Sequence, residues 1–250
     1  MRELECVRDG GILRLTLDVP GKKNALTDIL RAELREAIAA AQDDASVTAI
    51  ILCGAGGSFS SGGDISAMTS DPDVARRRMS ILHDTARMLI AGRKPSVSAV
   101  AGPAFGAGFS LALCCDAVIA DTSAKFCASF GRIGLPPDLA LGWTLPSRVA
   151  PAKARQLLLS SRVVEAAEAG TLGIADAVVE PAALMETAHR WAAELAANLP
   201  GPKGHLKALL ALDTLDRVLA AEMESYVACL ASEEHLAARQ AFLSKSKART

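Results

Sequence analysis

The sequence predicts an α/β fold over its first two-thirds, followed by a region that contains only helices. Short strand-like segments alternate with helical patterns up to about residue 120, an order typical of layered α/β domains. Beyond that point, alanine and leucine recur at helical spacing. Half of the 250 residues are apolar, so the chain can bury a full core.

The first strand and the first helix are predicted from hydrophobic spacing. Residues 12–17 alternate apolar and polar positions as a half-buried strand does, and Pro20-Gly21 forms the turn that ends it. A helix is expected over residues 27–42, with Thr27 as its N-cap, because its apolar residues recur every three or four positions.

The same alternation continues through the α/β part of the chain. The expected elements are a strand at 48–52, a helix at 74–91 ended by Gly92, a strand at 96–101, a short helix at 108–115 and a strand at 117–120.

The last third of the chain is predicted to be helical. Helices are expected at residues 151–160, 182–198 and 206–243, the last of them broken at least once. Pro200-Gly201-Pro202 is interpreted as a hinge. We therefore divide the chain into a core at 1–195 and a C-terminal helical region at 196–250. Because these helices are apolar on more than one face, the chain is expected to self-associate.

Charge and composition exclude several classes of function. The formal net charge is −1 and no long run of one sign occurs, so a nucleic-acid partner is not expected. The four histidines are scattered without a ligand at i+4, so no metal site is predicted. Six cysteines without a Cys-x-x-Cys pair, and an N-terminus without a secretory pattern, indicate reduced thiols in the cytoplasm.

One uncharged stretch, residues 95–115, is long enough to cross a bilayer. Pro103 and the glycines Gly102, Gly106 and Gly108 interrupt it, and the residues before Gly102 alternate as in a strand. The stretch is therefore predicted to be a strand, a turn and a short helix, with no membrane span.

Two glycine-rich loops have the composition of an oxyanion site. In residues 59–65 (Phe-Ser-Ser-Gly-Gly-Asp-Ile), small side chains leave backbone N–H groups accessible to a ligand. In residues 102–110, a strand end passes into a helix N-terminus, whose free N–H groups favour negative charge. Two such donors meeting at one carbonyl oxygen would form an oxyanion hole, although each loop taken alone is better explained as an ordinary tight turn.

Four segments together resemble a known family. They are Asn24-Ala25-Leu26, the loop at 59–64, the segment Lys94-Pro95-Ser96-Val97-Ser98-Ala99-Val100-Ala101-Gly102, and residues 106–116 (Gly-Ala-Gly-Phe-Ser-Leu-Ala-Leu-Cys-Cys-Asp). In order and spacing they look like the signatures of the crotonase, or enoyl-CoA hydratase/isomerase, superfamily. The resemblance extends to Ala241-Phe242-Leu243 and so covers nearly the whole chain.

The resemblance implies an α/β fold, a spiral of β-β-α units followed by a helical trimerisation region, with trimers often paired into hexamers. It implies an acyl-CoA substrate whose thioester oxygen lies between the N–H groups of Gly63 and Ala107. Coenzyme A would enter only as part of the substrate, with no tightly bound cofactor.

The resemblance also implies residues that bind coenzyme A. The loop around Lys23 and Ala25, together with Asp64, Ile65 and Ser66, would line the adenine end of the bent cofactor. Phe242 and Lys245 match positions that reach the coenzyme A of a neighbouring subunit in some relatives.

The two glutamates of a hydratase in this family are missing. Ser110 and Phe130 stand at their positions, and neither side chain can act as a carboxylate acid or base. Asp138, in Arg132-Ile133-Gly134-Leu135-Pro136-Pro137-Asp138, matches the single acid of the isomerase branch. It could also merely cap a helix that starts near Leu139.

The family position favours Asp138 as the base of an isomerase. It would move a proton from the α-carbon to the γ-carbon of a 3-enoyl-CoA while the oxyanion hole stabilises the enolate. The aromatic residues Phe105, Phe109, Phe130 and Trp143, if they line the pocket, would raise the pKa of Asp138. The loop at 66–73 and the helix after it would set the pocket's depth.

Other functions remain open from the sequence. Ring-opening isomerisation of an aromatic CoA epoxide would use the same groups. A weak hydratase or a thioester hydrolase on the same scaffold is a second hypothesis, and a non-catalytic CoA-binding subunit is a third.

Overall fold

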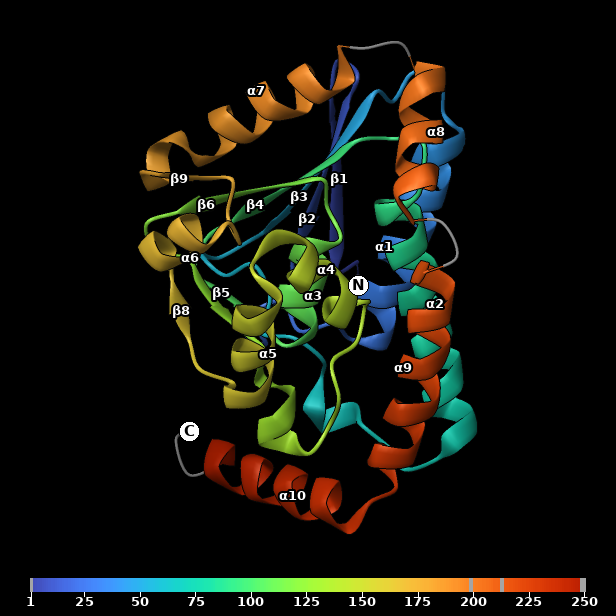
Figure 1. Cartoon of the computed structure of the whole chain (residues 1–250), viewed down its shortest axis with the longest axis vertical. Helices are drawn as coiled ribbons and strands as arrows, with labels where there is room; N and C mark the ends of the chain where they lie inside the picture. Colours follow the sequence, from blue (N-terminus) through green and yellow to red (C-terminus); the bar gives the residue numbers. More distant parts are fainter. Residues whose placement is uncertain (1, 198–199, 212–213, 248–250) are drawn as a thin grey trace.

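Two β-sheets form the centre of the fold in a computed structural model, which describes residues 2–197, 200–211 and 214–247 (Figure 1). The larger sheet consists, in spatial order, of β1 (Leu4–Asp9), β2 (Ile12–Leu17), β3 (Ala49–Gly54), β4 (Ser96–Val100), β6 (Ala117–Asp121) and β9 (Ala177–Val179). The smaller sheet consists of β5 (Pro103–Phe105), β7 (Lys125–Cys127) and β8 (Val164–Glu165). From β2 to β9 the larger sheet is parallel, and β1 pairs antiparallel with β2.

Helices surround both sheets (Figure 1). The α-helices are α1 (Asp28–Asp43), α2 (Pro72–Ile90), α3 (Ala107–Leu113), α4 (Leu141–Arg148), α5 (Pro151–Ser160), α6 (Ala166–Leu172), α7 (Leu184–Ala196), α8 (Pro200–Ala211), α9 (Thr214–Leu230) and α10 (Glu233–Lys247). Short 3-10 helices lie at η1 (Ile65–Ala67), η2 (Ser129–Ile133) and η3 (Pro181–Ala183).

The chain advances as a spiral in which each turn visits both sheets. It passes from β4 in the larger sheet to β5 in the smaller sheet and then into α3, and it repeats this path from β6 through β7 towards α4. One turn earlier, Ser60 follows β3 and pairs with Ala104 of β5 in an isolated parallel bridge. This confirms the predicted α/β spiral followed by a helical region.

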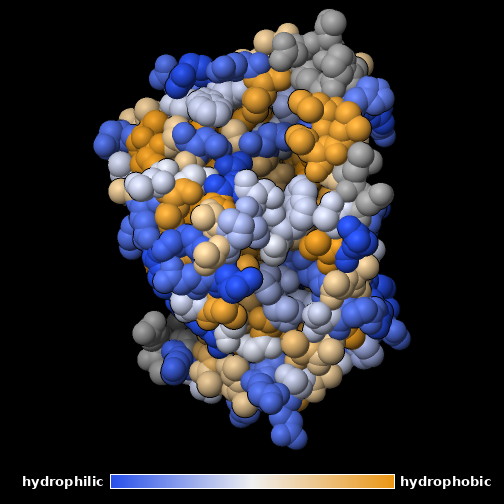
Figure 2. Space-filling model, in the orientation of Figure 1, coloured by the Kyte–Doolittle hydropathy of each residue, from blue (hydrophilic) through white to orange (hydrophobic). Residues whose placement is uncertain are grey.

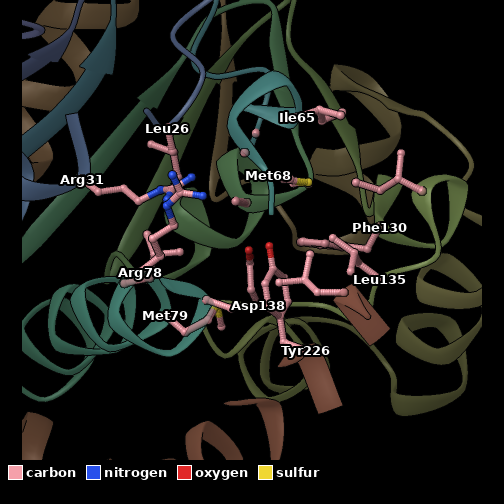
Figure 3. Close-up of a pocket in the computed structure, with 18 of the residues that line it drawn as sticks. Leu26, Arg31, Ile65, Met68, Arg78, Met79, Phe130, Leu135, Asp138 and Tyr226 are labelled. Atoms are coloured by element: carbon pink, nitrogen blue, oxygen red, sulfur yellow. The ribbon is translucent and has the colours of Figure 1, made fainter. Parts of the chain in front are cut away.

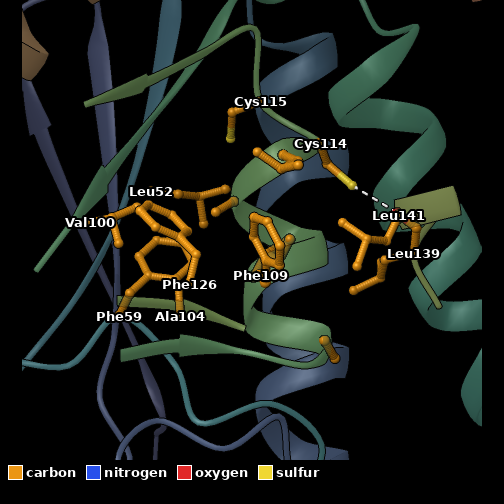
Figure 4. Packing of buried hydrophobic residues seen from close by; sticks show 14 of the residues in the cluster. Leu52, Phe59, Val100, Ala104, Phe109, Cys114, Cys115, Phe126, Leu139 and Leu141 are labelled. Carbon is orange, nitrogen blue, oxygen red and sulfur yellow. Dashed lines mark hydrogen bonds between the residues drawn. The ribbon is translucent and has the colours of Figure 1, made fainter. Parts of the chain in front are cut away.

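Different helices bury the two faces of the larger sheet. Successive residues of a strand point to opposite faces, so Ile51 packs with Ala188 of α7, whereas Leu52 belongs to the main core. Phe109 of α3 also lies in that core, with its ring centroid 5.4 Å from that of Phe126 (Figure 4). The helix that begins at one glycine-rich loop is thereby fixed against the sheets.

Most predicted elements are present within a few residues of their expected bounds. Strand β2 and helix α5 have the predicted bounds, and Thr27 caps α1 by accepting a hydrogen bond from the Leu30 N–H at 3.0 Å. The uncharged stretch at 95–115 forms β4, β5 and α3. In the described part of the chain, no helix is both long and apolar enough to cross a membrane.

Some strands were not predicted from the sequence, and one expectation is corrected. Strand β1 was not predicted; its side chains are mostly exposed, and it is held by pairing with β2. Residues 200–202 are not a hinge but begin α8. Proline is compatible with the first turn of a helix, where backbone N–H groups have no partner within the helix.

The helical region both covers the core and exposes apolar surface. Leu206, Leu209 and Leu210 of α8 are more than half exposed, and Figure 2 shows a large hydrophobic area over this helix. By contrast, Leu219 and Leu230 of α9 are buried. The division of the chain at residue 195 stays a prediction.

Asn24 bonds two other backbone segments, at Val19 and at residues 55–58, next to the glycine-rich loop. Its Oδ1 accepts a hydrogen bond from the Val19 N–H at 2.9 Å, and its Nδ2 donates to the carbonyl oxygens of Ala55 at 2.9 Å and Ser58 at 2.7 Å. The residue is buried and has a φ of 57°, a conformation that asparagine tolerates better than most residues. Asn24 therefore holds the segment that leads into the loop at 59–64.

Replacing Asn24 by Ala should lower the free energy of unfolding by about 3 kcal/mol, because three backbone groups lose the hydrogen-bond partner that the buried Asn24 side chain provides. Chemical denaturation measures this change. Lys23→Ala is the matched control, since Lys23 has a similar φ of 48° but an exposed side chain. Equal stability of the two variants would contradict this role of Asn24.

Candidate active site

The register of the smaller sheet brings the two glycine-rich loops together. The Ser60 N–H donates to the Pro103 oxygen at 2.9 Å, and the Phe105 N–H donates to the Ser60 oxygen at 3.0 Å. These bonds place Ser60 beside Ala104 in parallel register. Gly63 and Ala107 each lie three residues beyond this pair, so equivalent positions of the two loops meet.

Glycine is required at the two bends. Gly62 has a φ of +98°, and a Cβ there would lie 2.6 Å from the Phe105 oxygen, which is too close for any side chain. Gly106 has φ +51° and ψ −124°, a combination that residues with a Cβ avoid. Each glycine turns the chain immediately before a residue of the proposed oxyanion hole.

The N–H groups of Gly63 and Ala107 are available to a ligand. Within the described ranges, neither donates a hydrogen bond to the protein, although Ala107 is only 2% exposed. Ala107 is also the first residue of α3, where N–H groups lack partners within the helix. Both residues line one pocket together with Asp138, so the structure brings the three predicted catalytic residues together.

The pocket is walled mainly by apolar side chains from several elements (Figure 3). Its apolar lining includes Leu26, Ile65, Met68, Met79, Leu82, Phe130, Ile133, Leu135 and Leu230. Met68 and Thr69, from the loop expected to set the pocket's depth, are among the lining residues, as are four residues of α2. Asp138 is the only carboxylate among the described lining residues.

Asp138 is buried in the loop before α4, with 4% of its surface exposed. Helix α4 begins at Leu141 with Ala140 as its N-cap, so the alternative reading of Asp138 as a helix cap is wrong. Its Oδ1 has no hydrogen-bond partner among the described residues. A buried carboxyl oxygen without a protein partner is costly for folding, which is typical of a functional group.

Burial raises the pKa of Asp138 to about 8, and the negative charge of Glu222 adds to this effect. Arg31 and the Ser110 hydroxyl act in the opposite direction. Of the four aromatic residues expected around Asp138, Phe130 lines the pocket, whereas Phe109 belongs to the main core and Trp143 packs beside α9. Phe105 is also absent from the described lining, so the other apolar side chains desolvate the carboxyl group.

Buried polar contacts fix the loop that carries Asp138. Glu222 of α9 accepts a hydrogen bond from the Ala140 N–H at 3.0 Å, and its other oxygen pairs with Nε2 of His83 at 3.1 Å. The Cys114 thiol donates to the Leu139 oxygen at 3.3 Å (Figure 4). Leu139 and Ala140 both have positive φ, so these contacts hold a conformation that the residues alone disfavour.

Sequence reasoning missed several polar residues of the pocket, among them Tyr226 and Arg31. Tyr226 of α9 directs its hydroxyl into the same space as the Asp138 carboxyl (Figure 3), and burial together with the charge of Asp138 raises its pKa. Arg31 of α1 also lines the pocket. Arg31 had a sequence signal, because it precedes Leu34 and Ile38 by three and seven positions and so lies on the apolar face of its helix.

Five of the residues expected to bind coenzyme A lie on two loops that are side by side. The Ser61 N–H donates to the Lys23 oxygen at 2.9 Å, which places the loop of Lys23 and Ala25 against the loop of Asp64. The Asp64 carboxylate accepts hydrogen bonds from Nζ of Lys22 at 2.7 Å and from the Ser66 hydroxyl at 2.5 Å. Its pKa is lowered, because these bonds outweigh its burial. Ile65 lines the pocket itself.

Phe242 and Lys245 lie on α10, away from the pocket described here. Both are exposed, and neither is among the described lining residues. The helix itself is joined to the site by Arg239, whose guanidinium donates to the Ile65 and Ser66 oxygens at 3.1 Å. Their contact with coenzyme A from a neighbouring subunit stays a prediction.

Comparison with known proteins assigns the family. The model of the enoyl-CoA hydratase/isomerase family matches residues 8–249. The chain belongs to this family. Its similar relatives include a crotonyl-CoA hydratase of Syntrophomonas wolfei, 32% identical over 94% of this chain and 92% of that protein. They also include a 1,2-epoxyphenylacetyl-CoA isomerase of Escherichia coli, 32% identical over 94% of this chain and 93% of that protein.

Solved structures of the enoyl-CoA hydratase/isomerase family have the same fold. A crystal structure of an enoyl-CoA hydratase from Mycobacterium avium subsp. paratuberculosis superposes with a TM-score of 0.87 at 27% identity, covering 97% of this chain and 96% of the other. Membership in the family establishes an enzyme that acts on CoA thioesters. It does not choose between hydration and isomerisation, since relatives of both kinds occur.

The raised pKa of Asp138 predicts that this residue destabilises the fold at neutral and alkaline pH. Because its folded-state pKa of about 8 lies above the ordinary 3.8, the unfolded chain binds fewer protons, and stability is lost as the pH rises from about 4 to about 8. Asp138→Asn should therefore raise the free energy of unfolding, by roughly 2–5 kcal/mol at pH 8 and by little at pH 4.

Denaturation curves at both pH values measure this difference. Asp84→Asn is the control, because Asp84 lies on the exposed side of α2, where it pairs with Arg35. A wild-type protein more stable than Asp138→Asn at pH 8 would contradict the assigned burial cost.

Proposed function

We propose that the protein is an acyl-CoA isomerase that converts 3-enoyl-CoA to 2-enoyl-CoA through an enolate. The observation that carries this proposal is a single buried carboxylate, Asp138, in one pocket with the unbonded N–H groups of Gly63 and Ala107. An allylic isomerase requires these groups and no second acid.

The reaction needs one base that works twice. With the thioester oxygen held by the two N–H groups, ionised Asp138 removes a proton from the α-carbon, and the resulting enolate extends over the double bond. Protonated Asp138 then returns the proton to the γ-carbon, and the double bond moves into conjugation with the thioester. With a pKa near 8, Asp138 is a stronger base than an ordinary aspartate, and its pKa lies closer to that of the α-proton that it removes.

The apolar wall supports this reaction more than hydration. Hydration of a 2-enoyl-CoA requires a carboxylate that activates water and an acid that protonates the α-carbon, and Phe130 occupies one of the two family positions in the pocket. Ser110, at the other position, is buried in α3 and donates to the Gly106 oxygen at 3.3 Å. The side chains at these two positions therefore support isomerisation over hydration.

A second candidate is the ring-opening isomerisation of a CoA epoxide. The similarity to a 1,2-epoxyphenylacetyl-CoA isomerase over nearly the full length favours it. That reaction would use the same oxyanion hole and the same aspartate. Coenzyme A would enter either reaction only as part of the substrate, with its adenine end at Lys23, Ala25, Asp64, Ile65 and Ser66.

We further propose that the chain assembles as a homotrimer or a dimer of trimers through residues 196–250. The exposed leucines of α8 support this, because apolar side chains so exposed in a monomer favour association. In the assembly, Phe242 and Lys245 would reach a neighbouring subunit's coenzyme A.

Asp138→Asn should lower the turnover of 3-enoyl-CoA at least about a hundredfold, because no other described residue of the pocket can act as a carboxylate base. Turnover of 3-enoyl-CoA, 2-enoyl-CoA and saturated acyl-CoA is measured side by side, with Asp84→Asn as the matched control. Undiminished turnover in Asp138→Asn would reject the isomerase. Preferred hydration of 2-enoyl-CoA, preferred hydrolysis of saturated acyl-CoA, or binding without any turnover would assign the alternatives instead.

A further inference from the structure

Arg31 is a buried cation in a pocket walled mainly by apolar side chains. It is 7% exposed, although charged side chains are rarely buried to this degree. Its Nη1 pairs with Asp28 at 3.0 Å, but its Nε is buried without a hydrogen-bond partner among the described residues. Burial opposes the charge and lowers the pKa of the guanidinium. An arginine that only stabilised the fold by pairing with Asp28 could do so from the surface, because the Asp28 side chain is 54% exposed.

A second arginine lies beside it. Arg78 of α2 also lines the pocket, and it donates to the other oxygen of Asp28 and to the Ala67 oxygen. Figure 3 shows the guanidinium groups of Arg31 and Arg78 next to each other on the wall formed by α1 and α2. Two cations thus share one carboxylate, and the Asp28 side chain is 54% exposed, so water screens its charge. This wall carries a net positive charge.

An uncharged acyl chain would not balance the positive charge of this wall. Aliphatic carbons pack against the apolar side chains but offer the guanidinium groups of Arg31 and Arg78 neither a hydrogen-bond acceptor nor a negative charge. An acyl group with a carboxylate at its far end offers two acceptor oxygens and a negative charge, which an arginine binds more strongly than any neutral group.

We propose that the acyl pocket selects CoA thioesters whose acyl group ends in a carboxylate, bound by Arg31 with Arg78 beside it. This inference rests on the proposed function, because it assumes that the thioester oxygen lies at Gly63 and Ala107. It assigns the substrate class, an ω-carboxyacyl-CoA. Asp138 lies in the same pocket, so the α-carbon of such a substrate can reach the base while its carboxylate meets the arginines.

Binding tests the inference without catalysis. Calorimetry compares saturated ω-carboxyacyl-CoA thioesters, from succinyl-CoA to suberyl-CoA, with the ω-carbamoyl analogues of the same lengths, which keep the shape but lack the charge. The wild type should bind the carboxylate at least about tenfold more tightly than the carbamoyl group at one or more lengths. Equal affinities at every length would overturn the proposal.

Arg31→Met identifies the residue responsible, since methionine keeps an unbranched, apolar stem in the buried position. This variant should lose the tenfold preference. Arg35→Met is the matched control on the same helix, because Arg35 is exposed, pairs with Asp84 and is not among the described lining residues, and it should keep the preference. A preference retained in Arg31→Met would overturn the proposal. The proposal would also be overturned if Arg31→Met lost turnover but bound both analogues as the wild type does. Arg31 would then act only on the pKa of Asp138.

The outcomes separate this inference from the proposed isomerase. If neutral 3-enoyl-CoA is isomerised through Asp138 but no charge preference exists, only the substrate class is wrong. If the carboxylate preference depends on Arg31 but Asp138→Asn keeps full turnover, the reaction is wrong and the binding site stands.

Discussion

The parallel pairing of Ser60 with Ala104 is the constraint on which the site depends. It sets two successive turns of the spiral in register, so each loop delivers one backbone N–H to the same place. Gly62 makes this possible because it leaves room for the other loop, where a Cβ would collide with the Phe105 oxygen. Gly106 makes it possible because its backbone takes a conformation that residues with a side chain avoid. The donors are therefore fixed before a substrate arrives, which is the property that makes an oxyanion hole effective.

The Asp138 carboxyl group, which lines the same pocket as these donors, is buried at a cost in stability. Burial of Asp138 costs stability whenever the group is ionised, and Glu222 increases that cost. The hydrogen bonds of Glu222 and Cys114 to the loop at 139–140 keep the group in place. The buried charges of Asp138 and Arg31 both lower the stability of the fold. Such a loss of stability is common at functional sites.

Local sequence predicted much of the fold and part of the site. Thr27 acts through a hydrogen bond between its side chain and a nearby N–H group, and the glycine-rich loops act through their own backbone geometry. Residue type largely dictates both, so both could be predicted from the local sequence. The shared pocket of Gly63, Ala107 and Asp138 followed only from the family resemblance, because the contact between the loops is set by sheet register. Strand β1 was missed because it lies at a sheet edge with little burial. Tyr226 was missed because α9 reaches the pocket from a distant part of the chain, whereas Arg31 and Glu222 interrupt apolar stripes and could have been noticed.

The central claim is that the two backbone N–H groups polarise a bound thioester. Infrared spectroscopy of a bound acyl-CoA with a ¹³C-labelled thioester carbonyl measures this directly. The carbonyl stretch should move to lower wavenumber on binding than it has in water, and the shift should shrink in Ala107→Pro, which removes one N–H at a helix position that accepts proline. A bound carbonyl with the same frequency as in water, or a shift that Ala107→Pro leaves unchanged, would contradict the account.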